Sequence, residues 1–313
     1  MNNSSKKLFA AKLSITTALS LAILKFITGI MTGSMAVLSS AIDSVLDILM
    51  SAVNFLAIRH AEQPADDSHA YGHGKFETMA ALVQALIIGG SGVWILIESI
   101  NRLITGSEPQ KLGNGIVVLA VSVVASWLIS RYLVKVALET DSPALQADSL
   151  HFAMDVYTNL ALAGGLVLMY FFDIPWLDGL LSILVSCYIM SESYKLIRQA
   201  MKDVLDEQIP KAERNSIENI IRNQGCDQWN CHDLRTRKSG SHRIIDFHLT
   251  VCKNLTVDSS HGITEMLEEK IEDELPNSDI IIHIEPCSHE DCQGVPEECT
   301  HRPKSGDEVC KAE

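Results

Sequence analysis

The stretch Thr78–Ile97 (TMAALVQALIIGGSGVWILI) contains 20 consecutive residues without a charged side chain. A helix needs roughly 20 apolar residues to cross the hydrocarbon core of a bilayer. Two more uncharged runs follow, one of 19 residues at Leu112–Ser130 and one of 17 residues at Val156–Phe172. The first stretch therefore predicts a membrane-spanning helix, and the chain repeats the pattern.

These runs predict an α-helical membrane protein with six transmembrane helices. The first span carries Lys25 and the second carries Asp43 and Asp47, so their hydropathy is lower than that of the others. The alternative is a core of soluble helices, but six such runs within 206 residues would need a much larger soluble fold. The predicted spans are about 9–31, 35–59, 77–103, 112–138, 144–172 and 176–198.

The rest of the 313-residue chain has a different composition. Residues 1–206 carry a net charge of −4, whereas residues 207–313 carry −10, seven of the eight cysteines and seven of the eleven histidines. We therefore expect a transmembrane domain at 1–206, a metal-binding domain at 207–290 and an acidic Cys/His tail at 291–313. A net charge of −14 argues against nucleic acid as a partner, since a nucleic-acid binder needs a basic face.

The distribution of Lys and Arg predicts the orientation in the bilayer. Short loops on the cytoplasmic side are enriched in these residues. Both termini are therefore expected in the cytoplasm, with the protein in the inner (plasma) membrane of the cell, and the cysteines of the second part should be thiols. The basic residues on this side are Lys6, Lys7, Lys12, Arg59, Lys75, Arg131, Lys135, Lys195, Arg198 and Lys202.

Two of the predicted spans contain pairs of metal-ligand side chains. Asp43 and Asp47 are four residues apart in the second span, and His151 and Asp155 are four apart in the fifth. Residues at this spacing share one helix face. Two such helices can close a four-ligand site of three carboxylates and one imidazole.

Ionisable residues inside a membrane are costly and usually functional. Two carboxylates on one face in low dielectric repel each other, and either a divalent cation or a proton relieves this. The same site can therefore bind either one. The alternative is that these acids form structural ion pairs with Lys25 or Arg131, which explains a lone acid better than two matched pairs.

The pattern Asp43-x3-Asp47 with His151-x3-Asp155 resembles the cation diffusion facilitator family, and most strongly its bacterial iron/zinc efflux branch. Supporting stretches are PADDSHAYGHGK at 64–75 and HDLRTR at 232–237. The resemblance covers roughly residues 8–290. It implies a homodimeric divalent-metal/proton antiporter with six transmembrane helices, a cytoplasmic metal-binding domain, and a transport site formed by Asp43, Asp47, His151 and Asp155.

The loop between the second and third spans contains a second candidate site. His69 and His73 are four residues apart, with a carboxylate three residues before His69. This spacing suits one metal ion completed by water or a fourth ligand. By resemblance the ligands are Asp66, His69 and His73. The alternative is a polar turn whose histidines only lie at the membrane surface.

The second part of the chain alternates helical and strand patterns in the order α-β-β-α-β. This order predicts a small sheet with two helices on one face, like a metallochaperone. The expected elements are 211–223, 230–237, 243–251, 259–275 and 279–284. The resemblance implies this fold and a dimer contact, and it places tail ligands at His232, His248, His261, His283 and Glu285, the last at a position often held by Asp.

The end of the chain contains Cys287, His289, Cys292, Cys299, His301 and Cys310. Their spacings are not the Cys-x2-Cys of a zinc finger. Two interpretations stay open, a flexible tail that collects zinc or another soft metal, and a disordered tail with incidental cysteines.

The predicted function is export of Zn²⁺ from the cytoplasm in exchange for protons, with Fe²⁺, Cd²⁺ and Co²⁺ as further cargo. Zn²⁺ is also the expected structural or regulatory ion of the loop and tail. No Gly-x4-Gly-Lys-Ser/Thr motif for ATP is present, so a proton gradient is the expected driving force. A membrane metalloenzyme is a competing class, but no His-Glu-x-x-His motif occurs. A metal sensor without transport is another, for which six spans with buried acids are excessive. The chain is predicted to be a secondary transporter and not an enzyme.

Overall fold

The structure is a computed structural model that describes residues 3–32, 35–105, 116–172, 176–223 and 230–287. The chain divides into two compact units, Met1–Val204 and Leu205–Glu313. The expectations for the acidic Cys/His tail, from His289 onward, concern residues outside the described ranges.

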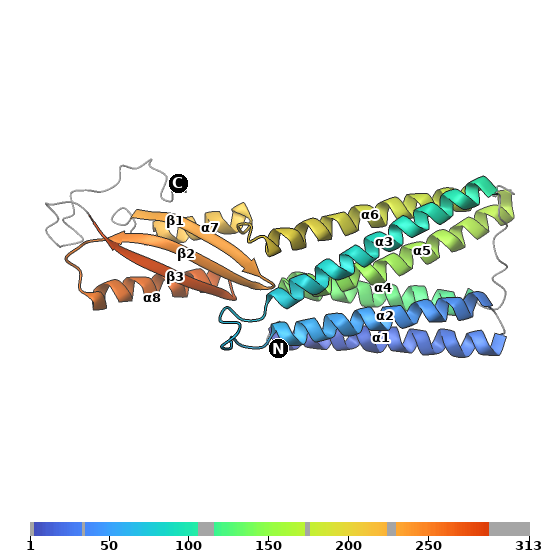
Figure 1. The fold of residues 1–313 in the computed structure, drawn as a ribbon, viewed down its shortest axis with the longest axis horizontal. Helices are drawn as coiled ribbons and strands as arrows, with labels where there is room; N and C mark the ends of the chain where they lie inside the picture. Colours follow the sequence, from blue (N-terminus) through green and yellow to red (C-terminus); the bar gives the residue numbers. More distant parts are fainter. Residues whose placement is uncertain (1–2, 33–34, 106–115, 173–175, 224–229, 288–313) are drawn as a thin grey trace. The chain divides into compact units, whose positions relative to one another are not determined.

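In its described residues the first unit consists of six long helices, as the uncharged runs predict. Helix α1 packs along α2, α3 along α6 and α4 along α5 (Figure 1). Helices of 25 to 31 residues are long enough to cross a bilayer. Their bounds are Asn3–Thr32 (α1), Met35–Ala61 (α2), Lys75–Thr105 (α3), Ile116–Thr140 (α4), Pro143–Phe172 (α5) and Trp176–Val204 (α6).

Large apolar side chains cover the outside of this bundle. Trp94 is 73% exposed and Leu138 is 78% exposed, whereas fully buried positions include Ala85, Ala147 and Ser14. Small residues between helices allow close packing inside a membrane, and an extended apolar exterior suits lipid. By length and hydropathy, α1, α3, α4 and α6 qualify as membrane spans among the described residues.

Helix α5 begins with a defined cap. Ser142 precedes Pro143, its carbonyl accepts the N–H of Gln146, and its hydroxyl accepts the N–H of Leu145 at 3.4 Å. Proline suits the first helical position because its φ is preset and it lacks the N–H that would be unpaired there. The chain therefore turns sharply after α4 and starts α5 at Pro143.

A buried ionic cluster ties this cap to α1, to the end of α2 and to α3. Lys7 of α1 is 3% exposed, forms an ion pair with Glu62, and donates to Glu77 of α3 at 3.1 Å. Glu77 is 1% exposed and also accepts the Ser142 hydroxyl at 2.8 Å. The cluster joins α1, the end of α2, α3 and the start of α5.

Replacing Lys7 by alanine should therefore destabilise the membrane unit. Removing one partner of a buried ion pair leaves an uncompensated charge and costs about 3–5 kcal/mol. The matched control is Lys6→Ala, because Lys6 pairs with Glu139 at 3.1 Å on the surface, where such a pair is worth about 0–1 kcal/mol. Thermal unfolding in detergent should show a clearly lower midpoint for Lys7→Ala only. Equal midpoints for the two variants would contradict a structural role of the cluster.

The second unit contains the predicted α-β-β-α-β order. Its elements are α7 (Lys211–Asn223), β1 (Asn230–Ser239), β2 (His242–Val251), α8 (Val257–Glu274) and β3 (Ser278–Pro286). The sheet order is β1-β2-β3, with β1 antiparallel to β2 and β2 parallel to β3. The predicted fold class is confirmed. Thr256 caps α8 by accepting the N–H of Ser259 at 3.1 Å.

Both helices of this unit cover the same face of the sheet. The core joins alternate residues of β2 to apolar residues of α7 and α8, and the intervening β2 residues face away from it. Because side chains alternate across a strand, one face of the sheet is apolar and covered while the other can carry polar ligands. The core residues of β2, α7 and α8 include Ile245, Phe247, Leu249, Ile217, Ile221, Leu267 and Ile271.

Candidate metal sites

The structure brings ligand side chains of α2 and α5 together within the membrane unit. Nε2 of His151 lies 3.0 Å from Oδ1 of Asp47, and Asp155 joins them in a group whose ligand atoms lie within 4.8 Å of one another. The side chains of His151 and Asp47 are 9% and 18% exposed. Two carboxylates and one imidazole at this separation can coordinate a single divalent cation.

The fourth predicted ligand, Asp43, lies on α2 one turn before Asp47. Residues four apart on a helix share a face. The structure describes the backbone of Asp43 but not its side chain. Its membership of the site stays a prediction.

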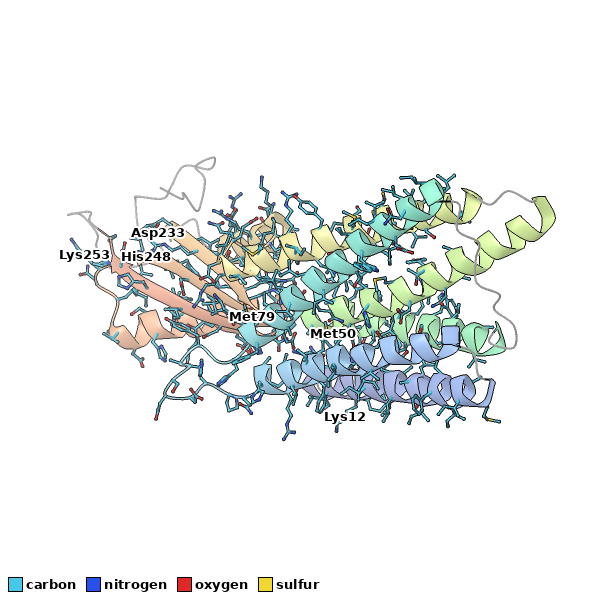
Figure 2. The ribbon with its side chains drawn as sticks, turned by 45° about the vertical axis from the view of Figure 1, so that its right-hand side comes forward. Lys12, Met50, Met79, Asp233, His248 and Lys253 are labelled. Atoms are coloured by element: carbon cyan, nitrogen blue, oxygen red, sulfur yellow. The ribbon has the colours of Figure 1, made fainter. Side chains whose placement is uncertain are left out.

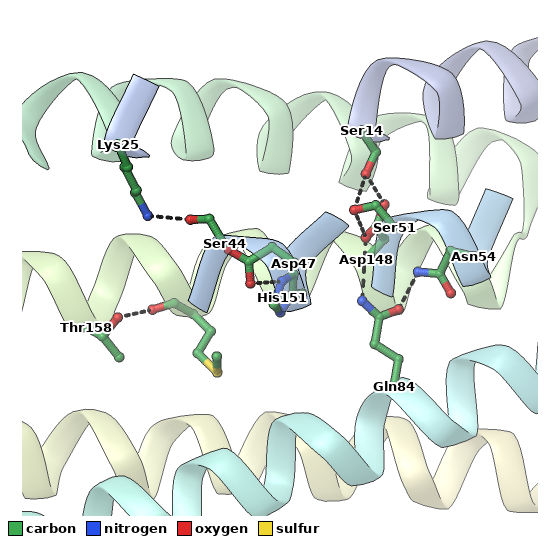
Figure 3. A network of polar contacts seen from close by, with 11 residues as sticks. Ser14, Lys25, Ser44, Asp47, Ser51, Asn54, Gln84, Asp148, His151 and Thr158 are labelled. Atoms are coloured by element: carbon green, nitrogen blue, oxygen red, sulfur yellow. Dashed lines mark hydrogen bonds and ion pairs between the residues drawn. The ribbon is translucent and has the colours of Figure 1, made fainter. Parts of the chain in front are cut away.

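A buried carboxylate, Asp148, lies one turn before His151 on α5 and supports this site. Asp148 is fully buried and accepts hydrogen bonds from Ser14 of α1 at 2.5 Å and from Ser51 of α2 at 3.5 Å (Figure 3). Gln84 of α3 also donates to it at 3.5 Å and accepts from Asn54. Asp148 precedes His151 by three residues, so this network fixes the helix turn that presents the imidazole.

Lys25 reaches the same region from α1. Its ammonium group donates to the hydroxyl of Ser44 at 2.9 Å, whereas the partner of Asp47 is His151 (Figure 3). Among the described side chains, Arg131 is exposed on α4. The interpretation of Asp47 as a structural partner of Lys25 or Arg131 is therefore less favourable than that of a ligand beside His151.

The loop between α2 and α3 brings its three predicted ligands together, with both histidines beside the carboxylate of Asp66. Asp66 lies 3.4 Å from Nδ1 of His69 through one oxygen and 3.3 Å from Nε2 of His73 through the other. The two imidazole rings are 4.5 Å apart. Gly72, at a φ of 77°, makes the tight turn between them, since this backbone region strains other residues. His73 is buried, and its Nδ1 has no hydrogen-bond partner among the described residues.

Backbone hydrogen bonds hold the carboxylate of Asp66 in place and stabilise its charged form. It accepts the N–H groups of His69 at 2.7 Å and Ser68 at 2.9 Å. The His69 N–H is the larger cause that holds the pKa of Asp66 below its ordinary value. A lowered carboxyl pKa keeps the charged form as the pH falls through the range in which an ordinary aspartate is protonated. Asp66 is therefore available as an anion over the whole physiological range.

Replacing Asp66 by asparagine should weaken zinc binding at the loop by at least about tenfold, because a directly coordinating group contributes more than the outer-shell partners worth that amount. Asparagine keeps an oxygen for the two backbone donors but removes the charge. The control is Asp67→Asn at the neighbouring exposed position. Calorimetric zinc titration of both full-length variants tests this, and equal loop affinities would count against Asp66 as a ligand.

The polar face of the C-terminal sheet carries a third group. His232 of β1 lies 3.2 Å from Glu285 through Nε2, and His248 of β2 lies 2.9 Å from it through Nδ1. All three are half-buried, and Nδ1 of His232 is buried without a partner among the described residues. Figure 2 shows His248 on this sheet. The nitrogen and oxygen donors fit zinc.

A bulge in β1 makes this group possible. Two residues of β1, Asp233 and Leu234, lie opposite one residue of β2 between the pairs His232↔His248 and Arg235↔Asp246, and Asp233 has a φ of 59°. A bulge re-aims side chains. Here Cys231 and Leu234 both enter the core while His232 faces His248.

The two remaining predicted tail ligands differ in position. His283 is 64% exposed, its Nε2 is 3.9 Å from Glu285, and its ring is 4.7 Å from that of His248. His261 lies on α8, 68% exposed, and forms an ion pair with Glu265 at 3.4 Å. Within one chain His261 does not join the three-residue group. Its role as a ligand stays a prediction.

Sequence reasoning missed the supports of these sites. It assigned no role to Asp148, to the Lys7–Glu77 pair or to the Lys25–Ser44 contact. The only available signal was the presence of single charged residues in apolar helices, which marks them as functional candidates but does not name their partners.

Comparison with known proteins agrees with this arrangement. Residues 11–205 match the family described as cation efflux transmembrane domain, and residues 209–287 match the cation efflux protein cytoplasmic domain, ZT_dimer. The chain therefore belongs to the cation diffusion facilitator family of cation-efflux transporters and is a multi-pass membrane protein.

Individual relatives cover most of the chain. The cation-efflux pump FieF of Citrobacter koseri is 36% identical over 82% of this chain and 85% of its own length. The FieF of Salmonella arizonae is 35% identical over 89% of this chain and 92% of its own length. A solved structure of CzrB in its zinc form is 30% identical over 26% of this chain and 92% of that chain, with a TM-score of 0.23. The predicted resemblance to the cation diffusion facilitator family is confirmed.

Proposed function

We propose that this protein exports Zn²⁺ from the cytoplasm in exchange for protons. The observation that carries the proposal is the group Asp47, His151 and Asp155, which joins two helices of an apolar six-helix bundle. Asp43 completes the proposed four-ligand set. The similar FieF proteins are named cation-efflux pumps, which supports export as the direction.

The donor set favours zinc as the cargo. Imidazole suits zinc and iron, whereas carboxylate-only sites suit magnesium, calcium and manganese. One imidazole among three carboxylates therefore places Zn²⁺ first, with Fe²⁺, Cd²⁺ and Co²⁺ as further cargo.

Proton exchange follows from the chemistry of the same ligands. Metal binding requires a neutral imidazole and ionised carboxylates, so metal and protons compete for the site. Moving a divalent cation out of a negatively charged cytoplasm costs about 2.3 kcal/mol per charge per 100 mV. Protons entering from outside would displace the metal at His151 and neutralise the carboxylates. One site that cannot hold both loads makes the exchange obligatory.

The loop and tail groups then have a regulatory role. We infer a homodimer in the inner membrane with both termini in the cytoplasm, where the tail samples cytoplasmic zinc. The matched ZT_dimer domain supports the dimer. Metal that binds the associated form better than the separate form would stabilise it by mass action.

Metal flux into proteoliposomes tests the proposal. With a panel of divalent cations at equal concentration and a proton gradient opposite to the metal, we expect the highest rate for Zn²⁺, intermediate rates for Fe²⁺, Cd²⁺ and Co²⁺, and none for Mg²⁺ or Ca²⁺. Flux equal to that of protein-free vesicles for every metal would contradict export. A maximum at Mn²⁺ would contradict the proposed cargo alone.

Asp47→Ala should abolish zinc flux, because it removes one ligand of the intramembrane group. The loop and tail groups use other residues, so their zinc binding and the thermal midpoint should be close to those of the wild type. The matched control is Glu139→Gln, which changes an exposed acid of α4 paired with Lys6. Wild-type flux through the Asp47→Ala protein would remove this residue from the transport site.

Zinc flux into the vesicles should rise when the proton concentration is higher inside than outside, and it should fall when an ionophore collapses this proton gradient. In His151→Ala, metal binding should weaken and flux should lose most of its dependence on the pH of the release side, since the proposed first proton acceptor is gone. Vesicles of both proteins, assayed across a series of release-side pH values, give the comparison. Flux insensitive to the gradient, together with an unchanged pH profile in His151→Ala, would overturn antiport.

A further inference from the structure

Strands β2 and β3 end side by side at the border of the tail metal group. They run parallel, and the last two paired positions are Thr250↔Glu285 and Val251↔Pro286. The N–H of Cys287 donates to the carbonyl of Val251 at 2.8 Å, which is the hydrogen bond that closes the last of these pairs. Cys252 and Cys287 each directly follow the last residue of their strand, so one further step of this register aligns the two cysteines.

Strand alternation puts both cysteines on the polar face of the sheet. His248 of β2 and both His283 and Glu285 of β3 lie on that face, as their mutual contacts show. Cys252 is four residues after His248, and Cys287 is two residues after Glu285. An even spacing along a strand keeps the same face. The thiols therefore extend the row of ligand side chains that begins at the histidines.

Both thiols are accessible to small ions. Cys252 and Cys287 are half-buried, and neither belongs to a disulfide. By contrast, Cys231 is fully buried in the core of the same unit.

We propose that Cys252 and Cys287 form a thiolate site for a thiophilic divalent cation, with Cd²⁺ or Zn²⁺ as the occupant, at the edge of the His232–His248–Glu285 group. Neighbouring strands are about 4.8 Å apart, and two sulfurs bound to one tetrahedral zinc ion at about 2.3 Å lie about 3.8 Å apart. Adjacent cysteines on one face can meet this distance by side-chain rotation. Each thiol releases its proton to solvent as the metal–sulfur bond forms.

The donor chemistry separates this site from the three other groups. Those groups use imidazole nitrogens and carboxylate oxygens, whereas thiolates select soft ions over magnesium, calcium and manganese. The thiol pair would let the tail respond to ions that its histidines bind less well. This inference rests on the proposed cytoplasmic placement of the tail, which keeps the thiols reduced, but not on transport through the bundle.

Cadmium binding to the full chain in detergent under a reductant tests the site. The background variant replaces Cys226, Cys292, Cys299 and Cys310 by serine, so that the sulfurs outside the described residues cannot contribute. Cadmium titration is followed by the near-ultraviolet absorption of the cadmium–thiolate bond and by the bound metal per chain. The further variants are Cys252→Ser and Cys287→Ser, and Cys187→Ser in α6 is the control.

The background protein and the Cys187→Ser control should show the cadmium–thiolate absorption. Each of Cys252→Ser and Cys287→Ser should lose most of it and weaken cadmium binding by at least about tenfold, because one site needs both ligands. Cadmium should also slow alkylation of Cys252 and Cys287 by a maleimide, identified by peptide mass, and leave Cys187 unaffected.

Two results would overturn the proposal. One is absorption unchanged by either serine substitution. The other is that each single variant loses half of the cadmium–thiolate absorption and the double variant loses the sum of the two losses, which indicates two independent thiols. Circular dichroism and dimer size of the variants exclude unfolding as the cause. The assay involves no flux, so failure of zinc export would leave its outcome unaffected.

Discussion

A carboxylate and an imidazole from different helices meet inside a bundle whose exterior is apolar. Asp47 and His151 are 3.0 Å apart, and both are largely withdrawn from solvent. Ionisable groups at such depth are costly unless they are paired, protonated or bound to a metal. The packing of α2 against α5 brings the two groups close enough to form an ion pair. On the proposed function, a metal ion and protons replace this pair in turn.

Helix α5 is the element on which the rest of the bundle converges. Its cap residue Ser142 bonds to α3, Asp148 bonds to α1, α2 and α3, and the carbonyl of Ser149 accepts from Ser130 of α4 at 2.9 Å. His151 then contacts α2. On the proposed mechanism, an exchange of metal for protons at His151 thus acts on a helix that is hydrogen-bonded to four others. This gives a physical route from ligand exchange to helix movement, because each of these hydrogen bonds is buried and expensive to break.

Local patterns in the sequence were sufficient to predict the helices and the α-β-β-α-β order, and to single out the two i,i+4 pairs as candidate ligands. These features depend on residues that are close along the chain. The network around Asp148 could not be predicted, because Ser14, Ser51 and Gln84 are isolated polar residues in three separate apolar runs. A serine or glutamine at such a position gives no sign of its hydrogen-bond partner until the packing of the helices is known.

Contacts in the C-terminal sheet were equally hard to predict from the sequence. The pairing of Cys252 with Cys287 depends on the register of two parallel strands joined through α8, and a shift of one residue would send one thiol to the opposite face. The bulge at Asp233 likewise decides that His232 faces His248. His261 was grouped with the other tail ligands on resemblance alone, whereas its place on α8 separates it from them within one chain.

The central claim is that α2 and α5 hold a metal ion inside the membrane unit. The most direct measurement is the zinc X-ray absorption spectrum of a full-length chain whose loop, tail and cysteine ligands have been replaced. The predicted result is one zinc ion per chain with a shell of nitrogen and oxygen at about 2.0–2.1 Å, including one imidazole. This signal should disappear when Asp47 is also replaced by alanine. Absence of bound zinc, or the same shell without Asp47, would contradict the claim.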